Sequence, residues 1–204
     1  MYDKILYYGD VIATNLYKNP NQIVKDIDKF SNDWKPYNPR KNPGREGLSI
    51  TSLDGGLSGV PDLDSVKEYC IKNNVELDEM DFSKPTPVYN VVSSYTELFK
   101  NDLGRSHFIK HKPGGFFPPH RDLGKDLTDI QSFRLFVPIQ NCNPPQSWFM
   151  LDRKPLNFEH GRAYFINTCI EHTLFSCYEA MFIVFNIAVN ENTVNTLLKN
   201  MQWR

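Results

Sequence analysis

The pattern of hydrophobic and polar positions changes near Gly104. After this residue, apolar positions form short runs or alternate with polar ones, and Gly, Pro, Asn or Asp residues separate the runs. Such spacing is typical of the short strands of a sandwich, jelly roll or barrel. The expected strands cover residues 105–111, 116–119, 132–140, 147–151, 154–158, 162–167, 172–177 and 180–190.

The first hundred residues mix helical and irregular patterns. Asn19 is a helix-capping residue type, and the apolar Ile23 and Ile27 that follow it have helical spacing. The other expected elements are strands at 2–8, 11–17 and 46–51, a helix from Pro61, and a helix over 91–103 that Asn90 would cap.

These patterns predict one domain, residues 1–204, which is mainly β with flanking helices (α+β). Residues 1–104 are expected to form a helical and loop-rich wrapping, and residues 105–190 the β core. Residues 191–204 are expected to form a C-terminal helix, since Val194, Leu197 and Met201 have helical spacing.

Composition narrows the possible environments and partners of the chain. The formal net charge is −1 over 204 residues, so a general attraction to nucleic acid or to an anionic membrane is not expected. No apolar run approaches the roughly 18 residues of a membrane-spanning helix, and the N-terminal pattern does not predict a signal peptide. The four cysteines have no CxxC spacing, which predicts free thiols and a cytoplasmic location.

The strongest candidate for chemistry is a pair of metal-binding residue types. His120 and Asp122 follow a Gly/Pro-rich turn with one residue between them, and His172 comes 50 residues after Asp122. Two histidines and one carboxylate form the ligand set of non-haem iron sites, which leave positions open on the metal. Each residue alone also suits a turn or a core position, but all three fall at expected strand ends, which favours a metal site.

The remaining histidines have weaker claims. His107 and His111 alternate along one expected strand, which suits either the mouth of a pocket or a solvated or structural position. His160 precedes Gly161 in an expected turn, and we interpret it as solvated or structural.

Several further motifs follow one another within residues 104–190. They are Gly104–Arg105, Lys112–Gly115, Pro119–Asp122, Arg134–Ile139, Gly161–Tyr164 and His172. In this order, they resemble the aspartyl/asparaginyl β-hydroxylase branch of the 2-oxoglutarate and Fe(II)-dependent oxygenases, and prolyl hydroxylase-like proteins share the scheme. The resemblance implies a double-stranded β-helix, a jelly-roll and cupin-like barrel that holds iron at one mouth.

The resemblance also implies roles for individual residues. His120, Asp122 and His172 would bind iron. The branch places an Arg for the far carboxylate of 2-oxoglutarate about ten residues after the second His, where this chain has Phe182. Arg134, within an apolar strand, is therefore predicted to hold that carboxylate.

Other candidates for binding come from the surrounding residues. Tyr164 and Phe165 alternate on a strand, so one of them is expected to face the interior, and we expect Tyr164 to close the co-substrate pocket. Lys110 and Arg162 are further candidates for the co-substrate. Candidates for the substrate are Trp34, Tyr37, Arg40, Arg45 and Arg105.

The resulting hypothesis is an enzyme, a dioxygenase that uses Fe(II), 2-oxoglutarate and O2 to hydroxylate a C–H bond with release of succinate and CO2. Its substrate would be a small molecule or a peptide, with a peptidyl or free amino acid as one candidate class. Two alternatives stay open: a cupin-like metal protein with another reaction, and a non-catalytic small-molecule binding module on the same barrel.

Overall fold

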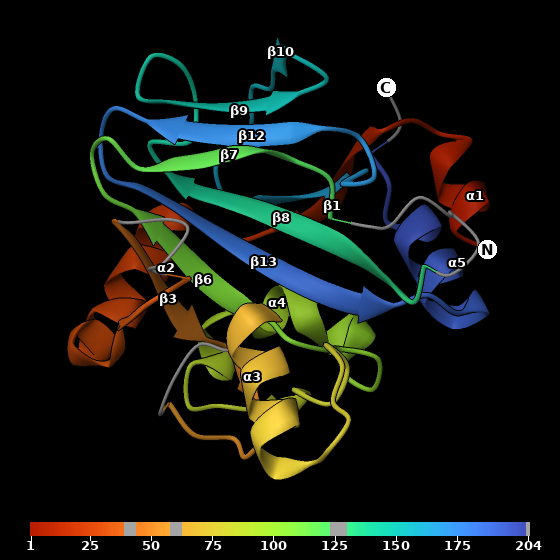
Figure 1. Cartoon of the computed structure of the whole chain (residues 1–204). Helices are drawn as coiled ribbons and strands as arrows, with labels where there is room; N and C mark the ends of the chain where they lie inside the picture. The colour runs from red at the N-terminus through yellow and green to blue at the C-terminus, as the bar shows by residue number, and fades with distance from the viewer. Residues whose placement is uncertain (39–43, 58–62, 123–129, 203–204) are drawn as a thin grey trace.

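The computed structural model describes residues 1–38, 44–57, 63–122 and 130–202, and its fold is mainly β. Two antiparallel sheets lie face to face, with the helices around the larger one (Figure 1). In the described residues the larger sheet has the order β1-β11-β8-β13-β6-β3-β2, and the smaller sheet the order β10-β9-β12-β7. From β6 onward the strands pass repeatedly from one sheet to the other, which is consistent with a jelly roll.

The strands have the following bounds. The larger sheet contains β1 (Val11–Tyr17), β2 (Lys35–Pro36), β3 (Arg45–Ser49), β6 (His107–His111), β8 (Ser132–Gln140), β11 (Arg162–Ile166) and β13 (Ala180–Ala188). The smaller sheet contains β7 (Phe116–His120), β9 (Ser147–Leu151), β10 (Lys154–Pro155) and β12 (His172–Ser176). A separate pair joins β4 (Thr51–Ser52) and β5 (Lys84–Pro85).

Two apolar layers cover the two faces of the larger sheet. One layer lies between the sheets and includes Phe136, Phe149 and Phe182. The other lies under the helices and includes Ile23, Phe165 and Leu197. Because both faces are covered, β8 and β13 are long runs of buried residues instead of strictly alternating ones.

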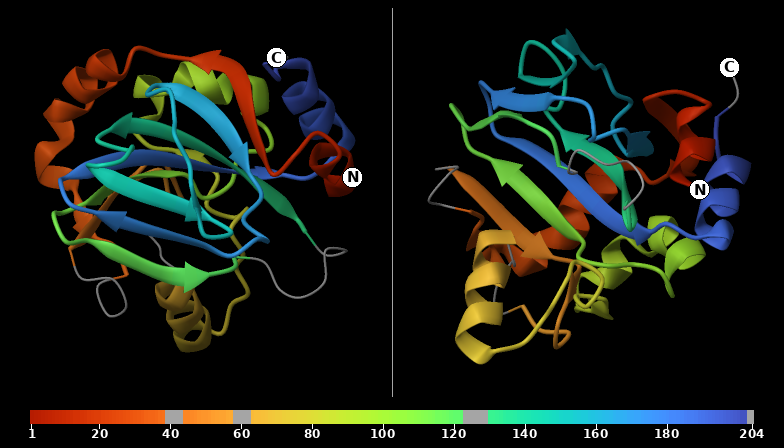
Figure 2. Two further views of the ribbon diagram at one scale, coloured as in Figure 1. Left: turned by 90° about the horizontal axis from the view of Figure 1, so that it is seen from above. Right: turned by 45° about the vertical axis from the view of Figure 1, so that its right-hand side comes forward.

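The helices are short and lie outside the sheets. Asn19 caps α2 by accepting from the backbone N–H of Asn21, as its residue type predicted. The first helix, α1, and the last, α5, lie side by side near the two termini (Figure 2). No helix in the described part of the chain is both long and apolar enough to span a membrane. The helix bounds are α1 (Tyr2–Leu6), α2 (Pro20–Ile27), α3 (Leu63–Asn73), α4 (Ser93–Thr96) and α5 (Glu191–Lys199).

Two of the expected elements are wrong. Residues 2–8 begin with helix α1 instead of a strand, because Tyr2 and Ile5, three residues apart, are buried together on one helical face. The helix expected over 91–103 is broken into the short helix α4 and two 3-10 turns, Tyr89–Val91 and Glu97–Phe99. Serines and β-branched residues fill this stretch, and they favour a continuous helix less than Ala or Leu do.

Gly161 supplies a testable feature of the fold just before β11. Its φ is +85°, and a Cβ on it would lie 2.2 Å from the carbonyl oxygen of Lys18. Gly114 has a similar φ of +79°, but a Cβ there would meet no atom within 4 Å. Gly114→Ala should therefore lower the free energy of unfolding by about 1–2 kcal/mol, the cost of the left-handed backbone conformation. Gly161→Ala should lower it by more, and equal losses in urea unfolding would contradict the steric account.

Candidate metal centre

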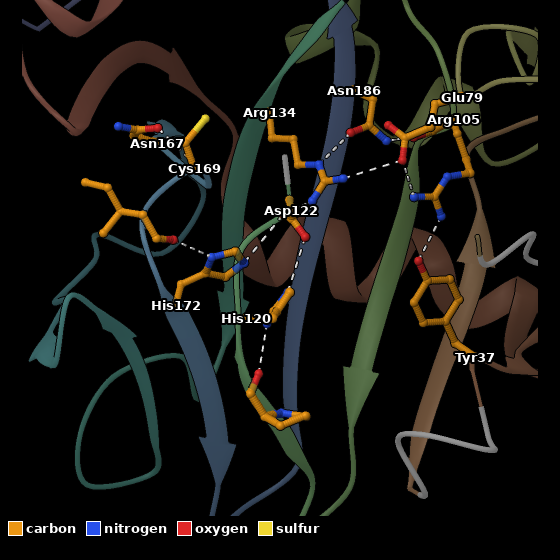
Figure 3. A network of polar contacts seen from close by, with 12 residues as sticks. Tyr37, Glu79, Arg105, His120, Asp122, Arg134, Asn167, Cys169, His172 and Asn186 are labelled. Carbon is orange, nitrogen blue, oxygen red and sulfur yellow. Dashed lines mark hydrogen bonds and ion pairs between the residues drawn. The ribbon is translucent and has the colours of Figure 1, made fainter. Parts of the chain in front are cut away.

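The structure brings His120, Asp122 and His172 together between the two sheets (Figure 3). His120 ends β7 and His172 begins β12, and these two residues are direct partners in the antiparallel pairing of the strands. One ligand atom from each of the three residues lies within 4.8 Å of the others. His120 and His172, 52 positions apart in the sequence, thus meet because β7 and β12 are neighbours in the smaller sheet.

Backbone carbonyls orient both imidazoles. Nδ1 of His120 lies 2.8 Å from the carbonyl oxygen of Pro118, and Nδ1 of His172 lies 3.0 Å from that of Ile170. A carbonyl oxygen only accepts, so Nδ1 of each ring carries the proton and Nε2 presents a lone pair. This is the arrangement that metal-binding histidines usually have.

The lone pairs of the site face one another. Nε2 of His120 lies 3.2 Å from Oδ1 of Asp122, and Nε2 of His172 lies 3.5 Å from Oδ2. Nε2 of His120 is buried and has no hydrogen-bond partner among the described residues. Burial lowers the pKa of both rings, to about 4 for His172, so the rings are neutral near pH 7. Two neutral imidazole nitrogens and a carboxylate thus lie close together, and such a donor set fits a divalent metal ion.

A buried ionic network holds the Asp122 carboxylate. Arg134 on β8 donates from Nη1 to the Asp122 carboxylate and from Nε to Oδ1 of Asn186, 2.9 Å away. Its Nη2 lies 3.4 Å from Oε1 of Glu79. Glu79 also accepts from Arg105 at 3.0 Å, so one carboxylate bridges two guanidinium groups.

The sequence reasoning missed Glu79 and Asn186. Glu79 lies in an irregular stretch before the first strand of the β core, and no motif marks it. Asn186 is the only polar residue in the apolar strand β13, and that single polar position was the available signal.

The charge of Glu79 gives a pH prediction. Burial alone would raise the pKa of Glu79, but Arg134 and Arg105 together outweigh it and lower the pKa below the usual range. A lowered pKa in the folded state stabilises the fold above the ordinary carboxyl pKa, about 4.3, and this contribution disappears as the pH falls through the folded pKa. Glu79→Gln should therefore be less stable than the wild type near pH 7, with a difference that shrinks below about pH 4. Urea midpoints measured across this range check it, and a difference independent of pH would contradict it.

Some of the predicted binding residues line a pocket at the triad, and others lie elsewhere. A cavity of about 130 Å³ in front of the triad is lined by Tyr37, Arg45, Arg105 and Arg134, together with the triad itself. Apolar residues from both sheets, such as Phe136, Phe149, Leu174 and Phe182, complete its wall. Arg40 lies outside the described residues.

Four predicted binding residues are not among those that line the pocket: Trp34, Lys110, Arg162 and Tyr164. His107, Ile109 and His111 of β6 face the cavity, so Lys110 faces the other side, where its Nζ lies 4.3 Å from the ring of Trp34. Arg162 is held by Glu159 and by the carbonyl oxygen of Thr14. Tyr164 does lie in the layer between the sheets, as alternation predicted, but it packs on Phe158 away from the cavity.

The two weaker histidines do line the pocket. His107 and His111 are each 3% exposed, and burial lowers the pKa of both, to about 3 for His111. Nδ1 of each ring is buried with no hydrogen-bond partner among the described residues. Buried polar atoms are normally satisfied, so these two nitrogens are available to water or to a ligand in the cavity.

Comparison with known proteins identifies the fold. No family model and no curated protein matches the chain. Among solved structures, the chain is similar to a prolyl-4-hydroxylase from Pseudomonas putida, with 12% identity, a TM-score of 0.51, and coverage of 92% of this chain and 96% of that one. It is also similar to HygX from Streptomyces hygroscopicus, solved with nickel and 2-oxoglutarate bound, with 10% identity, a TM-score of 0.56, and coverage of 92% and 86%.

The chain therefore shares the fold of these two proteins. Identities this low show the fold alone, so the function has to be argued from the site.

Proposed function

We propose that this chain is a non-haem Fe(II) and 2-oxoglutarate-dependent oxygenase that hydroxylates a C–H bond. One observation carries the proposal: the neutral Nε2 atoms of His120 and His172 and the carboxylate of Asp122 converge without a proton between them. Two histidines and one carboxylate are the ligand set of Fe(II) oxygenases, and they leave positions open for a chelating co-substrate and O2.

The charge of the pocket supports a doubly negative co-substrate. Three guanidinium groups, from Arg45, Arg105 and Arg134, face or flank the cavity, against the carboxylates of Asp122 and Glu79. A divalent metal bound by the triad would add two positive charges. A dianion such as 2-oxoglutarate offsets most of this charge in a buried site, where unpaired charge is costly.

The residues of this chain would bind and orient, while the bound groups supply the oxidation. With iron and 2-oxoglutarate bound, one atom of O2 enters succinate as CO2 leaves, and the other enters the substrate C–H bond to give an alcohol. Pro118 and Ile170 hold the Nδ1 protons of the two imidazoles, so that both Nε2 atoms stay available. Arg134 fixes the Asp122 carboxylate, and Phe136 and Phe149 help to exclude water.

Succinate formation tests the proposal. The substrate is not needed for this test. Slow turnover of 2-oxoglutarate without a substrate is measurable as succinate release in air with added Fe(II). Wild type should release succinate, and release should stop without O2, without Fe(II) and in His172→Ala. No succinate above the His172→Ala background, with and without a panel of amino acids and peptides, would reject the proposal.

One observation favours a second candidate function, a cupin-like metal protein with another reaction. Phe182 occupies the β13 position where the resembling branch has a basic residue for 2-oxoglutarate. A cupin-like metal protein with another reaction would not need that residue. It would bind the metal through the same triad but show no dependence on 2-oxoglutarate.

The remaining expectations are part of the proposal. The substrate is a small molecule or a peptide, and a peptidyl or free amino acid would match the aspartyl/asparaginyl hydroxylase-like branch. The four cysteines are free thiols, which supports a reducing, cytoplasmic environment.

A further inference from the structure

His111 lines the cavity beside the turn that joins β6 to β7. It is the last residue of β6, and it is only 3% exposed. The residues of β6 that face the cavity are His107, Ile109 and His111, so a polar residue stands on each side of an apolar one. A ligand that lies along this strand would meet a hydrogen-bonding group at each end of an apolar stretch.

The turn covers one nitrogen of the His111 ring. A Cβ placed on Gly115 would lie 3.3 Å from Nδ1 of His111, so the glycine packs directly against this atom. The carbonyl oxygen of Gly115 accepts from the backbone N–H of Ser176 at 2.9 Å. Nδ1 of His111 is therefore buried at the turn, and it has no hydrogen-bond partner among the described residues.

This environment selects the tautomer of the ring. Burial, with a smaller contribution from the charge of Arg45, lowers the pKa of His111 to about 3, so the ring is neutral near pH 7 and carries a single N–H. A buried N–H without an acceptor is rarer in proteins than an acceptor that is left unused. The proton of His111 therefore belongs on Nε2, the nitrogen that a ligand in the cavity can reach.

The polarity of His111 is then opposite to that of the triad histidines. His120 and His172 carry their protons on Nδ1 and present a lone pair from Nε2, which suits a metal ion. His111 presents an N–H from Nε2, which suits an anion. The same cavity thus offers acceptors to a cation in one place and a donor to an anion in another.

The strand pairing places His111 away from the metal ligands. On β13, Asn186 is the direct partner of Arg134, the residue that holds the carboxylate of the triad. At the other end of β13, Ala180 is the direct partner of His111. Phe182 lies between these two levels and lines the cavity. A ligand bound at the triad would therefore cross an apolar stretch before its far end reached His111.

We propose that His111 donates a hydrogen bond to the far carboxylate of a dicarboxylic 2-oxo acid that is bound at the triad. The inference rests on the proposed function and names a residue that determines which acid is accepted. A donor in this place would distinguish an acid with a far carboxylate from one that ends in a methyl group. Arg134 would then act on the Asp122 carboxylate instead of on the acid.

The test compares two acids on proteins loaded with Ni(II). 2-Oxoglutarate and 2-oxovalerate have the same chain length, but only the first has a far carboxylate. Each acid is titrated calorimetrically, without O2, into wild type, His111→Phe and His111→Leu. The wild type should prefer 2-oxoglutarate. Both variants lose a hydrogen bond to a charged group, so they should bind 2-oxoglutarate about 10–10²-fold more weakly and 2-oxovalerate almost as the wild type does.

Two further variants separate the hydrogen bond from packing and from the loss of a histidine as such. His111→Gln keeps an N–H donor, so it should retain part of the preference for 2-oxoglutarate. His160→Phe makes the same exchange away from the pocket lining, where Nε2 of His160 accepts from the backbone N–H of Cys142, and it should change neither acid. Ni(II) affinity is measured on every variant to confirm an intact triad.

Each outcome decides the assignment. A reduced preference for 2-oxoglutarate in His111→Phe and His111→Leu, with normal Ni(II) affinity, supports it. A wild-type preference in either variant, or equal weakening of both acids, overturns it and leaves the proposed function standing. Loss of Ni(II) affinity in both variants also overturns it, since His111 would then act on the metal centre. If neither acid binds the metal-loaded wild type, the proposed function itself is rejected, and the role of His111 with it.

Discussion

Replacing Asp122 with Asn should reduce divalent-metal affinity by more than 10²-fold. Asn keeps the shape of the side chain but removes the single negative charge of the ligand set. Changes to residues that only orient metal ligands typically cost about 10–100-fold, so loss of the only anionic ligand should exceed that range. The measurement is calorimetric titration of the metal-free protein with Ni(II) or Co(II), which bind such sites more tightly than Fe(II).

Asp26→Asn is the control for Asp122→Asn in the same titrations. Asp26 lies on α2 and pairs with Lys18 at 3.1 Å, away from the pocket lining. Asp26→Asn should bind Ni(II) as the wild type does. Wild-type affinity in Asp122→Asn would show that the metal is held elsewhere, and the ligand assignment would fail.

Replacing Arg134 with Met should have the second largest effect, on stability and on the metal site together. The side chains of Arg134, Asp122 and Glu79 are 14%, 13% and 19% exposed, so the pairs between them are largely buried. Removing one partner of a buried ion pair costs about 3–5 kcal/mol, because the remaining charge is left uncompensated. Urea unfolding of the metal-free protein should show a loss of this order, and Ni(II) affinity should fall about 10–100-fold as Asp122 loses its orientation.

Arg162→Met is the matched control. The Arg162 side chain is also 14% exposed, but its partner Glu159 is 55% exposed, and ion pairs with such exposed groups contribute about 0–1 kcal/mol. Arg162→Met should leave Ni(II) affinity unchanged and destabilise the fold less. Equal losses in the two variants would mean that the network around Glu79 contributes no more than a surface pair.

Sequence alone could not distinguish two roles for Arg134, binding the co-substrate and holding Asp122. Within its apolar strand, Arg134 was a plausible cation for the co-substrate. In the structure its guanidinium contacts Asp122, the proposed metal ligand, so a variant of Arg134 is expected to perturb metal binding as well as any ligand next to it.

The hydrophobic pattern predicted the β core well, because apolar runs and the turns that flank them mark its strands. β8 and β9 have the bounds expected from their apolar runs and flanking turns, and the His-x-Asp spacing located the triad. The helix Tyr2–Leu6 was mistaken for a strand, because a segment of that length carries too few apolar positions to distinguish a period of 3.6 from a period of 2.

The wall of the pocket depends on contacts that the sequence does not encode locally. Glu79 pairs with Arg134 and Arg105 from an irregular stretch, and neither hydrophobic periodicity nor a motif predicts such a contact. The side of β6 that faces the cavity depends on the pairing of the two sheets. For this reason Lys110 was a candidate for the co-substrate, although its strand neighbours His111 and Ile109 are the residues that face the cavity.

The central claim is that His120, Asp122 and His172 bind one metal ion with a 2-oxo acid beside it. A crystal structure of the protein grown without O2 with Ni(II) and 2-oxoglutarate tests it most directly, since anomalous scattering locates the nickel independently of the protein. The account predicts a single strong peak bonded to Nε2 of His120, Nε2 of His172 and the carboxylate of Asp122, with the acid in the same cavity. Nickel bound to other residues, or a triad that remains without metal at saturating Ni(II), would contradict it.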